Sequence, residues 1–447
     1  MAPRLDGGCL AWTIVASSFM VSFLQDGFRD SFGLLLPSLA SHFSVGRAEA
    51  ALTSSIMTLL TLGSGPLVAG LLTSLGHRTT TLVGVLLATL GLLLSGLYIQ
   101  LVTSEPDILV LYATVGLLTG LGFGLMYLPA MDIVEHYFSR RLGLAMGLAC
   151  CGSGLGQFVL APLLHLATES LGLAYTLYCL AATVASAAVF ALFYRLPRQD
   201  EEEEEQKGIQ NMAFQFEVEQ KIAKEKPSKE TEAKPIKETK AASSLKSYIA
   251  VLSSPSMILL LTSHFLVHLG IFSVFTFSTD RAVQSGGVTH SESSLLLSIM
   301  GVSNCLGRIV FGQVLDKFRH HSILLTTLIV LTNSLTVLSS DFLSGMIGHG
   351  VHAVVFGFTF GAYVCSVVPV LKILSKDITI PLGLSLLTFA LASVAGPVGV
   401  GSLYDALGSY TPGFLGVGCL GVVGALLLPL VSLTLPRKEE KDNNMQC

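Results

Sequence analysis

Long apolar stretches separated by short polar turns dominate the pattern along this 447-residue chain. A helix that crosses a bilayer needs about 20 mostly apolar residues. Twelve stretches of the chain suit such a helix, near residues 10–38, 50–75, 80–102, 108–133, 142–166, 174–194, 257–277, 292–315, 322–340, 344–371, 382–404 and 412–435. The pattern therefore predicts an all-α membrane protein with twelve transmembrane helices in two six-helix halves.

A polar segment rich in Lys and Glu separates the sixth stretch from the seventh. It has too few apolar residues to bury a core of its own, so we expect a disordered, solvated linker. The predicted organisation is an N-terminal six-helix half, a charged cytoplasmic linker, a C-terminal six-helix half and a cytoplasmic tail, over residues 1–197, 198–247, 248–436 and 437–447.

Composition supports the membrane class and excludes several others. Only 13% of the residues are charged and 51% are hydrophobic, whereas soluble domains carry about 25% charged residues. The chain has no phosphate-binding loop of the G-x-x-x-x-G-K-[ST] type and no Cys or His spacing typical of a metal site. Linker lysines alternate with glutamates, so no nucleic-acid patch is expected. We therefore expect no enzyme, no cofactor, no metal and no nucleic-acid partner.

Basic residues predict the orientation, because cytoplasmic loops of membrane proteins are enriched in Lys and Arg. With the N-terminus inside, the outer short loops hold only Arg47 and Arg281. The inner side then holds eleven: Arg4, Arg78, Arg140, Arg141, Lys317, Arg319, Lys372, Lys376, Arg437, Lys438 and Lys441. Both termini and the linker are therefore predicted to be cytoplasmic.

Two basic residues remain inside predicted spans, Arg29 in the first and Arg308 in the eighth. A charge at the centre of a transmembrane helix costs about 2.5–3.5 kcal/mol on insertion scales, so such a residue usually lines a polar cavity. Arg29 belongs to the stretch LQDGFRDSFG, which also carries Asp26 and Asp30. A rise of about 1.5 Å per residue places this group in the outer part of the span. Cavity lining and an outer-rim loop both stay open.

Six spans, a polar linker and six more spans are the layout of the major facilitator fold. That fold predicts related loops after spans two and eight. The second reads GQVLDKFRHH and holds Gly312, Asp316 and Lys317, whereas the first reads AGLLTSLGHR and lacks the acid. A third copy, GSLYDALG, follows span eleven. The pattern resembles the superfamily's loop motif, whose charges would latch an inner gate. A short polar turn is the alternative.

Two further stretches, DGGCLAW at 6–12 and YFSRRLGLAMGLACCGSGLG at 137–156, resemble the two signatures of the monocarboxylate transporter family. The second match is long and includes Arg140 and Arg141, which we add to the gating candidates. In the first, Cys9 stands where an aromatic residue is usual. Further similarity runs through LLLSIMGVSNCLGRIVFG and GPVGVGSLYDALGSYTPGF, so the resemblance covers both halves and identifies a divergent member.

This resemblance implies an alternating-access carrier of small organic solutes, often monocarboxylates moved with a proton. Proton-coupled members have a Lys late in span one, and an Asp one turn before an Arg in span eight. Here that Arg is Arg308, the Asp position is Asn304, and the Lys position falls on or beside Asp30. Both departures bear on proton coupling.

Arg308 is the main candidate for substrate binding, because guanidinium pairs bidentately with a carboxylate. Asn304 lies one helical turn away on the same face and can hydrogen-bond a substrate but cannot titrate. Arg29, Tyr127 and Tyr363 are further substrate-binding candidates. A structural ion pair of Arg308, and ordinary helix packing of the tyrosines, are the alternatives.

Asp30 and Asp26 are the leading candidates for proton coupling, because a carboxylate in a desolvated cavity can take up a proton. His264 and His268, spaced four residues apart in span seven, are further candidates because imidazole titrates near neutral pH. Packing histidines are the alternative interpretation.

The sequence thus predicts a plasma-membrane carrier of the monocarboxylate transporter type for a small organic anion or zwitterion. Its expected partners are that solute, a proton where transport is coupled, the lipid bilayer and a single-span glycoprotein that some family members need. The alternatives are a proton-independent facilitator of an amino acid, creatine, carnitine or thyroid hormone, and a non-transporting receptor or sensor on the same fold.

Overall fold

The computed structural model describes residues 8–102, 106–138, 142–196, 251–284, 287–318, 321–375 and 379–434. Within these ranges every regular element is a helix. Eleven helical segments are long and apolar enough to cross a membrane. The predicted linker at 198–247 and the tail at 437–447 lie outside the described residues.

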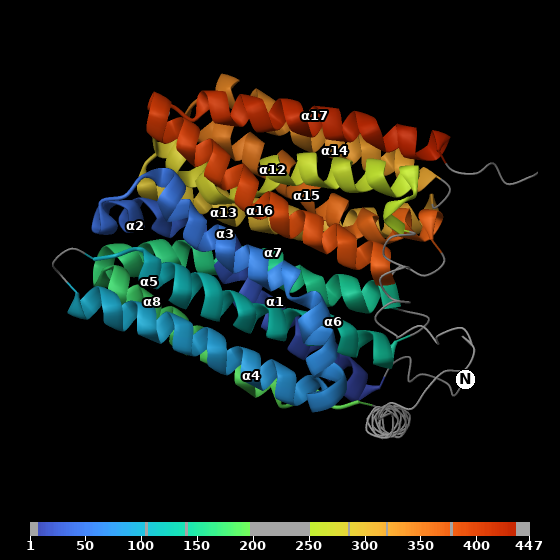
Figure 1. Cartoon of the computed structure of the whole chain (residues 1–447), viewed down its shortest axis with the longest axis horizontal. Coiled ribbons are helices and arrows are strands. Elements are labelled where there is room, and N and C mark those ends of the chain that lie inside the picture. Colours follow the sequence, from blue (N-terminus) through green and yellow to red (C-terminus); the bar gives the residue numbers. More distant parts are fainter. Residues whose placement is uncertain are drawn as a thin grey trace, which may run out of the picture.

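Two helical bundles lie side by side, the first in blue to green and the second in yellow to red (Figure 1). The first bundle contains α1 (Cys9–Ser31), η1 (Phe32–Leu35), α2 (Leu36–Phe43), α3 (Arg47–Gly63), α4 (Gly65–Leu101), α5 (Leu109–Leu111), η2 (Tyr112–Thr119), α6 (Gly120–Tyr137), α7 (Leu142–Leu171), α8 (Leu173–Ala185) and α9 (Ala187–Ala191). The second contains α12 (Pro255–Gln284), α13 (His290–Lys317), α14 (Ser322–Ser339), η4 (Ser340–Phe342), α15 (Gly345–Leu374), α16 (Thr379–Leu407) and α17 (Thr411–Leu433).

The second and third predicted spans share α3 and α4. Helix α3 has 17 residues and is followed, after Ser64, by the first turns of α4. Gly76 then adopts a φ of 73°, a left-handed conformation that glycine tolerates, and breaks α4 in two. The part of α4 before Gly76 completes the second span and the rest forms the third. The prediction of an all-helical membrane fold is confirmed.

Apolar side chains on the surface and hydrogen-bonded polar side chains in the core are arranged as a membrane fold requires. Exposed leucines such as Leu86, Leu97 and Leu101 lie along α4, where the surrounding acyl chains replace water. Many of the buried polar side chains are Ser and Thr that bond backbone carbonyls within their own helices, as Thr61 does to Met57 O at 2.8 Å. Helices can therefore pack closely without stranding these hydroxyls.

The two halves meet along α7 against α13 and α3 against α16. At the first crossing, a Cβ on Gly154 would collide with the carbonyl oxygen of Gly301, and the reverse is also true. Only glycine allows the backbones to approach this closely. We call the end of the bundle with the turn between α2 and α3 the outer end, following the orientation predicted from the sequence.

Candidate functional site

The polar stretch of the first span forms a buried ion cluster. Arg29 places Nη1 3.0 Å from Asp26 Oδ1 and Nε 2.9 Å from Asp30 Oδ1. All three residues lie in α1, and the helical segment continues through η1 and α2 to Phe43. Asp26 and Asp30 are both buried. The cluster therefore sits inside the bundle on a continuous span, and no loop begins at this stretch.

Arg308 lies buried in α13 and reaches across the interface between the halves. Its Nε donates to Asn304 Oδ1 at 3.0 Å, one turn earlier on the same helix. Its Nη1 donates to the carbonyl oxygen of Cys150 in α7, in the other half, at 2.9 Å. Among the described residues, no ion pair joins Arg308 to a carboxylate. The hydrogen bonds of the guanidinium therefore go to neutral oxygens, and Asn304 Nδ2 is buried without a partner.

The two arginines share one electrostatic environment. Asp26 interacts with Arg29, Asp30 and Arg308. Tyr127 of α6 is half-buried and lies close enough to interact with Asp26, Arg29 and Arg308. The fold thus brings together most of the residues predicted to bind substrate or carry a proton, from α1, α6 and α13.

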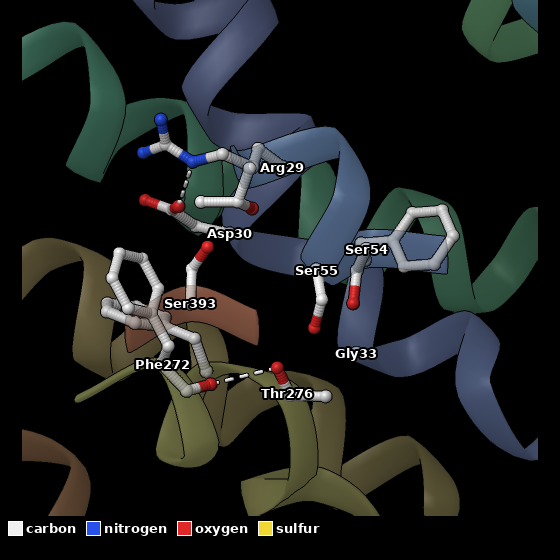
Figure 2. A pocket seen from close by; sticks show the side chains of 11 residues that line it. Arg29, Asp30, Gly33, Ser54, Ser55, Phe272, Thr276 and Ser393 are labelled. Atoms are coloured by element: carbon white, nitrogen blue, oxygen red, sulfur yellow. Dashed lines mark hydrogen bonds and ion pairs between the residues drawn. The ribbon is translucent and has the colours of Figure 1, made fainter. Parts of the chain in front are cut away.

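A cavity of about 20 Å³ lies beside this cluster, between the two halves. Its lining includes Arg29 and Asp30 from α1, and Figure 2 shows the Arg29 side chain bonded to Asp30 at one edge. Residues of η1, α3, α12 and α16 complete the lining: Phe32, Gly33, Ser54, Ser55, Thr58, Phe272, Phe275, Thr276 and Ser393. This space holds about one water molecule, so an organic solute can enter only after the halves move apart.

The sequence patterns did not predict the hydroxyl and aromatic residues that line the cavity opposite Arg29 and Asp30. The run Thr53-Ser54-Ser55 is the one signal that was present, because three consecutive small polar residues are unusual within an apolar span. Phe272 and Ser393 carry no such signal, and only the packing of α12 and α16 against the first half brings them to the cavity.

His264, His268 and Tyr363 form a separate group within the second half. The His268 ring stacks on the Phe389 ring with centroids 3.8 Å apart. The ring centroid of Tyr363 lies 5.3 Å from that of His268. His268 Nδ1 is 2.7 Å from the carbonyl oxygen of His264. These contacts are those of packing residues, although His264 Nδ1 and the Tyr363 hydroxyl are buried without partners.

Two of the predicted gating residues, Gly312 and Lys317, lie toward the end of the bundle opposite the outer turn. Gly312 and Lys317 both belong to α13, so this motif starts within the helix, and Lys317 lies exposed in its last turn. The Lys317 ammonium sits 5.7 Å from the ring centroid of Phe318. Arg140 and Arg141 lie outside the described residues, as does the side chain of Asp316.

Contacts at the outer end join the two halves. The Arg47 side chain lies 2.8 Å from Asp280 Oδ2 of α12, and the Tyr410 hydroxyl donates to the same carboxylate oxygen. Asp405 of α16 accepts hydrogen bonds from the backbone N–H groups of Arg47 and Ala48 at 2.7 and 3.0 Å. It therefore caps the N-terminus of α3 from the other half, a role that suits a carboxylate.

This outer closure revises one sequence expectation. The charge pattern places Arg47 and Arg281 in outer loops, but Arg47 begins α3 and Arg281 lies buried in the last turn of α12. The Arg281 guanidinium lies 4.4 Å from the ring centroid of Phe414. Asp405 belongs to the third copy of the loop motif, so the motif marks this residue but not its contact at the outer end.

Comparison with known proteins agrees with this architecture. The family model described as Major Facilitator Superfamily matches residues 18–378. A solved structure of a mutant of the nucleoside transporter NupG superposes with a TM-score of 0.67 at 14% identity, over 94% of this chain and 99% of that one. The likeness to NupG concerns the fold alone.

Curated relatives match over nearly the whole chain. Monocarboxylate transporter 12 of Mus musculus is 28% identical over 438 residues, covering 97% of this chain and 87% of the relative. Monocarboxylate transporter 3 of Gallus gallus is 29% identical over 439 residues, covering 96% and 79%. Both resemblances found in the sequence are therefore confirmed. The chain belongs to the Major Facilitator Superfamily and is a divergent, multi-pass membrane transporter of its monocarboxylate transporter family.

Proposed function

We propose that this transporter moves a small organic carboxylate by alternating access, with Arg308 binding the carboxylate group. The observation that carries the proposal is the buried guanidinium at the interface of the halves, which neutral oxygens of Asn304 and Cys150 hold. A carboxylate that displaces the Cys150 carbonyl would gain charge-assisted hydrogen bonds. The same step would break a contact between the halves, so binding and opening are coupled.

The Arg29 cluster has a different role in this proposal. Two nitrogens of the Arg29 guanidinium, Nη1 and Nε, already pair with carboxylates, so it competes less with Arg308 for the substrate anion. The cluster and Tyr127 form the opposite wall of the site and orient the remaining part of the solute. The contacts at Arg47 and Asp405 close the outer end in this conformation.

Proton-independent transport is the favoured mode, because Asn304 replaces the titratable group that proton-coupled relatives have before the arginine. Proton symport is the second candidate, and the burial of Asp26 and Asp30 beside the cavity favours it. The proposed location is the plasma membrane, with both termini in the cytoplasm.

Uptake of labelled lactate or pyruvate into proteoliposomes tests substrate class and coupling together. We expect uptake without a proton gradient. Arg308→Ala should lower it at least about 30-fold, since removing one partner of a buried charge pair costs about 2–5 kcal/mol. Arg308→Lys keeps the charge but loses the bidentate geometry, so it should also lower uptake, by less than Arg308→Ala. Lys372→Ala, at an exposed position of α15, is the control. Normal uptake by a correctly folded Arg308→Ala protein would overturn the binding assignment.

The same preparation separates the remaining alternatives. Uptake that requires an inward proton gradient would replace facilitated transport with symport through Asp26 or Asp30. Failure with every monocarboxylate, but uptake of an amino acid, creatine, carnitine or thyroid hormone, would move the proposal to another solute. Saturable binding without flux would indicate a receptor or sensor.

A further inference from the structure

A compact group of two histidines and one aspartate lies away from the transport cavity. His77 Nε2 is 2.7 Å from Asp132 Oδ2, and His136 Nε2 is 3.4 Å from the same oxygen. One ligand atom from each residue lies within 4.8 Å of the others. The His77 side chain is 2% exposed, whereas Asp132 and His136 are 38% and 25% exposed. The group therefore has one buried wall and one side open to an entering ion.

Local backbone geometry explains how the three side chains meet. Asp132 and His136 are four residues apart on α6, so they project from one face of that helix. His77 follows Gly76, whose left-handed conformation breaks α4 at this point. Farther along the same two helices, Gly84 and Gly122 lie so close that neither could carry a Cβ. The spacing between α4 and α6 is therefore fixed by backbone contact.

The donor set selects the class of metal. Imidazole nitrogens favour Zn²⁺, Cu²⁺ and Ni²⁺, whereas Mg²⁺ and Ca²⁺ prefer oxygen ligands. Zinc bonds nitrogen and oxygen at about 2.0–2.2 Å, so neighbouring ligands of a tetrahedral ion stand about 3.4 Å apart. The separation between His136 Nε2 and Asp132 Oδ2 already matches that value. His77 Nε2, now 2.7 Å from the same oxygen, would have to move about 0.7 Å away from it to reach that value.

We propose that His77, Asp132 and His136 form a binding site for Zn²⁺, with the fourth coordination position open to water. Sequence spacing does not show the site, because 55 residues separate His77 from Asp132. The bound ion connects the start of the third span to the end of the fourth. It therefore braces the first half at the end opposite the outer turn.

Zinc titration of the purified full-length protein in detergent, after treatment with a chelator, tests this site. We expect one zinc ion per chain by calorimetry and a rise in the thermal unfolding midpoint that Mg²⁺ and Ca²⁺ do not reproduce. His136→Gln and His77→Gln should each weaken binding at least about 10-fold, as loss of even indirect metal contacts does. His136 is partly exposed, so its variant retains the fold if His77→Gln does not.

His165→Gln is the matched control, because His165 also lies four residues from a carboxylate, Glu169, at 3.5 Å, and no third ligand joins them within the part of the chain that the structure describes. It should bind zinc as the parent protein does. Equal zinc affinity in the parent, His136→Gln and His77→Gln would overturn the site. The same conclusion follows if the parent shows no zinc-dependent stabilisation. Because the readout is binding, the result is independent of the transport assays.

Discussion

Arg47 of the first half and Asp280 of the second are joined by an ion pair with Nε and Oδ2 2.8 Å apart. Asp280 is 2% exposed and Arg47 is 19% exposed. Because α3 and α12 belong to different halves, the transporter cannot open its outer end without separating this pair. The contact is therefore a property of one conformation rather than of the fold alone.

Removing this pair should favour the conformation that is open at the outer end. Breaking a buried ion pair costs about 3–5 kcal/mol, and the partial exposure of Arg47 lowers this to about 2 kcal/mol, or about 30-fold in population. We expect Arg47→Ala to increase labelling of a Ser55→Cys cavity probe by an impermeant thiol reagent added from outside. The probe is placed in a background without accessible native cysteines.

Tyr410→Phe is the control for that experiment, since it removes one hydrogen bond to Asp280 and leaves the ion pair with Arg47 in place. The labelling rate of Tyr410→Phe should be closer to that of the parent than the labelling rate of Arg47→Ala is. If Arg47→Ala labels no faster than the parent, the pair does not hold the outer end closed.

Asp405→Ala should have a smaller effect of the same sign. The Asp405 carboxylate accepts two backbone N–H groups at the start of α3, and loss of such a cap costs about 1 kcal/mol. We therefore expect about fivefold more outward opening in the same labelling assay. Asp405→Asn keeps one acceptor oxygen and should fall between Ala and the parent. Equal labelling in all three proteins would contradict the capping role.

Asn304→Asp should make transport dependent on a proton gradient. Asn304 Oδ1 already accepts a hydrogen bond from Arg308 Nε at 3.0 Å, so a carboxylate at this position would compete with the substrate anion for the guanidinium. Protonation would relieve that competition. We expect uptake at neutral pH to fall and to recover with an inward proton gradient, and Asn304→Gln to show no such recovery. Gradient-independent uptake by Asn304→Asp would disprove this coupling.

Gly154→Ala should destabilise the interface between α7 and α13. The added Cβ would collide with the Gly301 carbonyl oxygen, which is backbone and cannot rotate away. Overpacking of this kind costs about 1–3 kcal/mol, so thermal unfolding should begin several degrees earlier and transport should slow. Gly147→Ala on the same helix meets no atom within 4 Å and serves as the control. Identical melting of the two variants would show that the crossing can adjust.

Hydropathy and charge were sufficient to predict the helical membrane fold, because a bilayer imposes a length and a polarity on every crossing segment. The same reasoning identified Arg29 and Arg308, since uncompensated charges inside apolar helices are rare. The resemblance to the two family signatures was sufficient to predict the transporter family, although Cys9 replaces the aromatic residue that is usual in the first signature.

Contacts between distant segments were beyond the sequence patterns. Nothing local to Arg47 indicates that Asp280, 233 positions later, is its partner. Ser393 looks like any small residue in an apolar span, and its place beside the cavity depends on how α16 packs against the first half. The depth of Asp26 was also open, because helix length alone does not say whether a charged turn ends a span or lies within it.

The shared environment of Arg29, Asp26, Asp30 and Arg308 has an electrical consequence. With both carboxylates ionised, the formal charges of these four side chains cancel. If this site carries a monoanion without a proton, each cycle moves one negative charge across the membrane, and that charge is worth about 2.3 kcal/mol per 100 mV. Such transport is electrogenic, so an inside-negative voltage of about 100 mV would favour efflux by about 50-fold. Membrane voltage, as well as concentration, would then decide whether a cell imports or exports the solute.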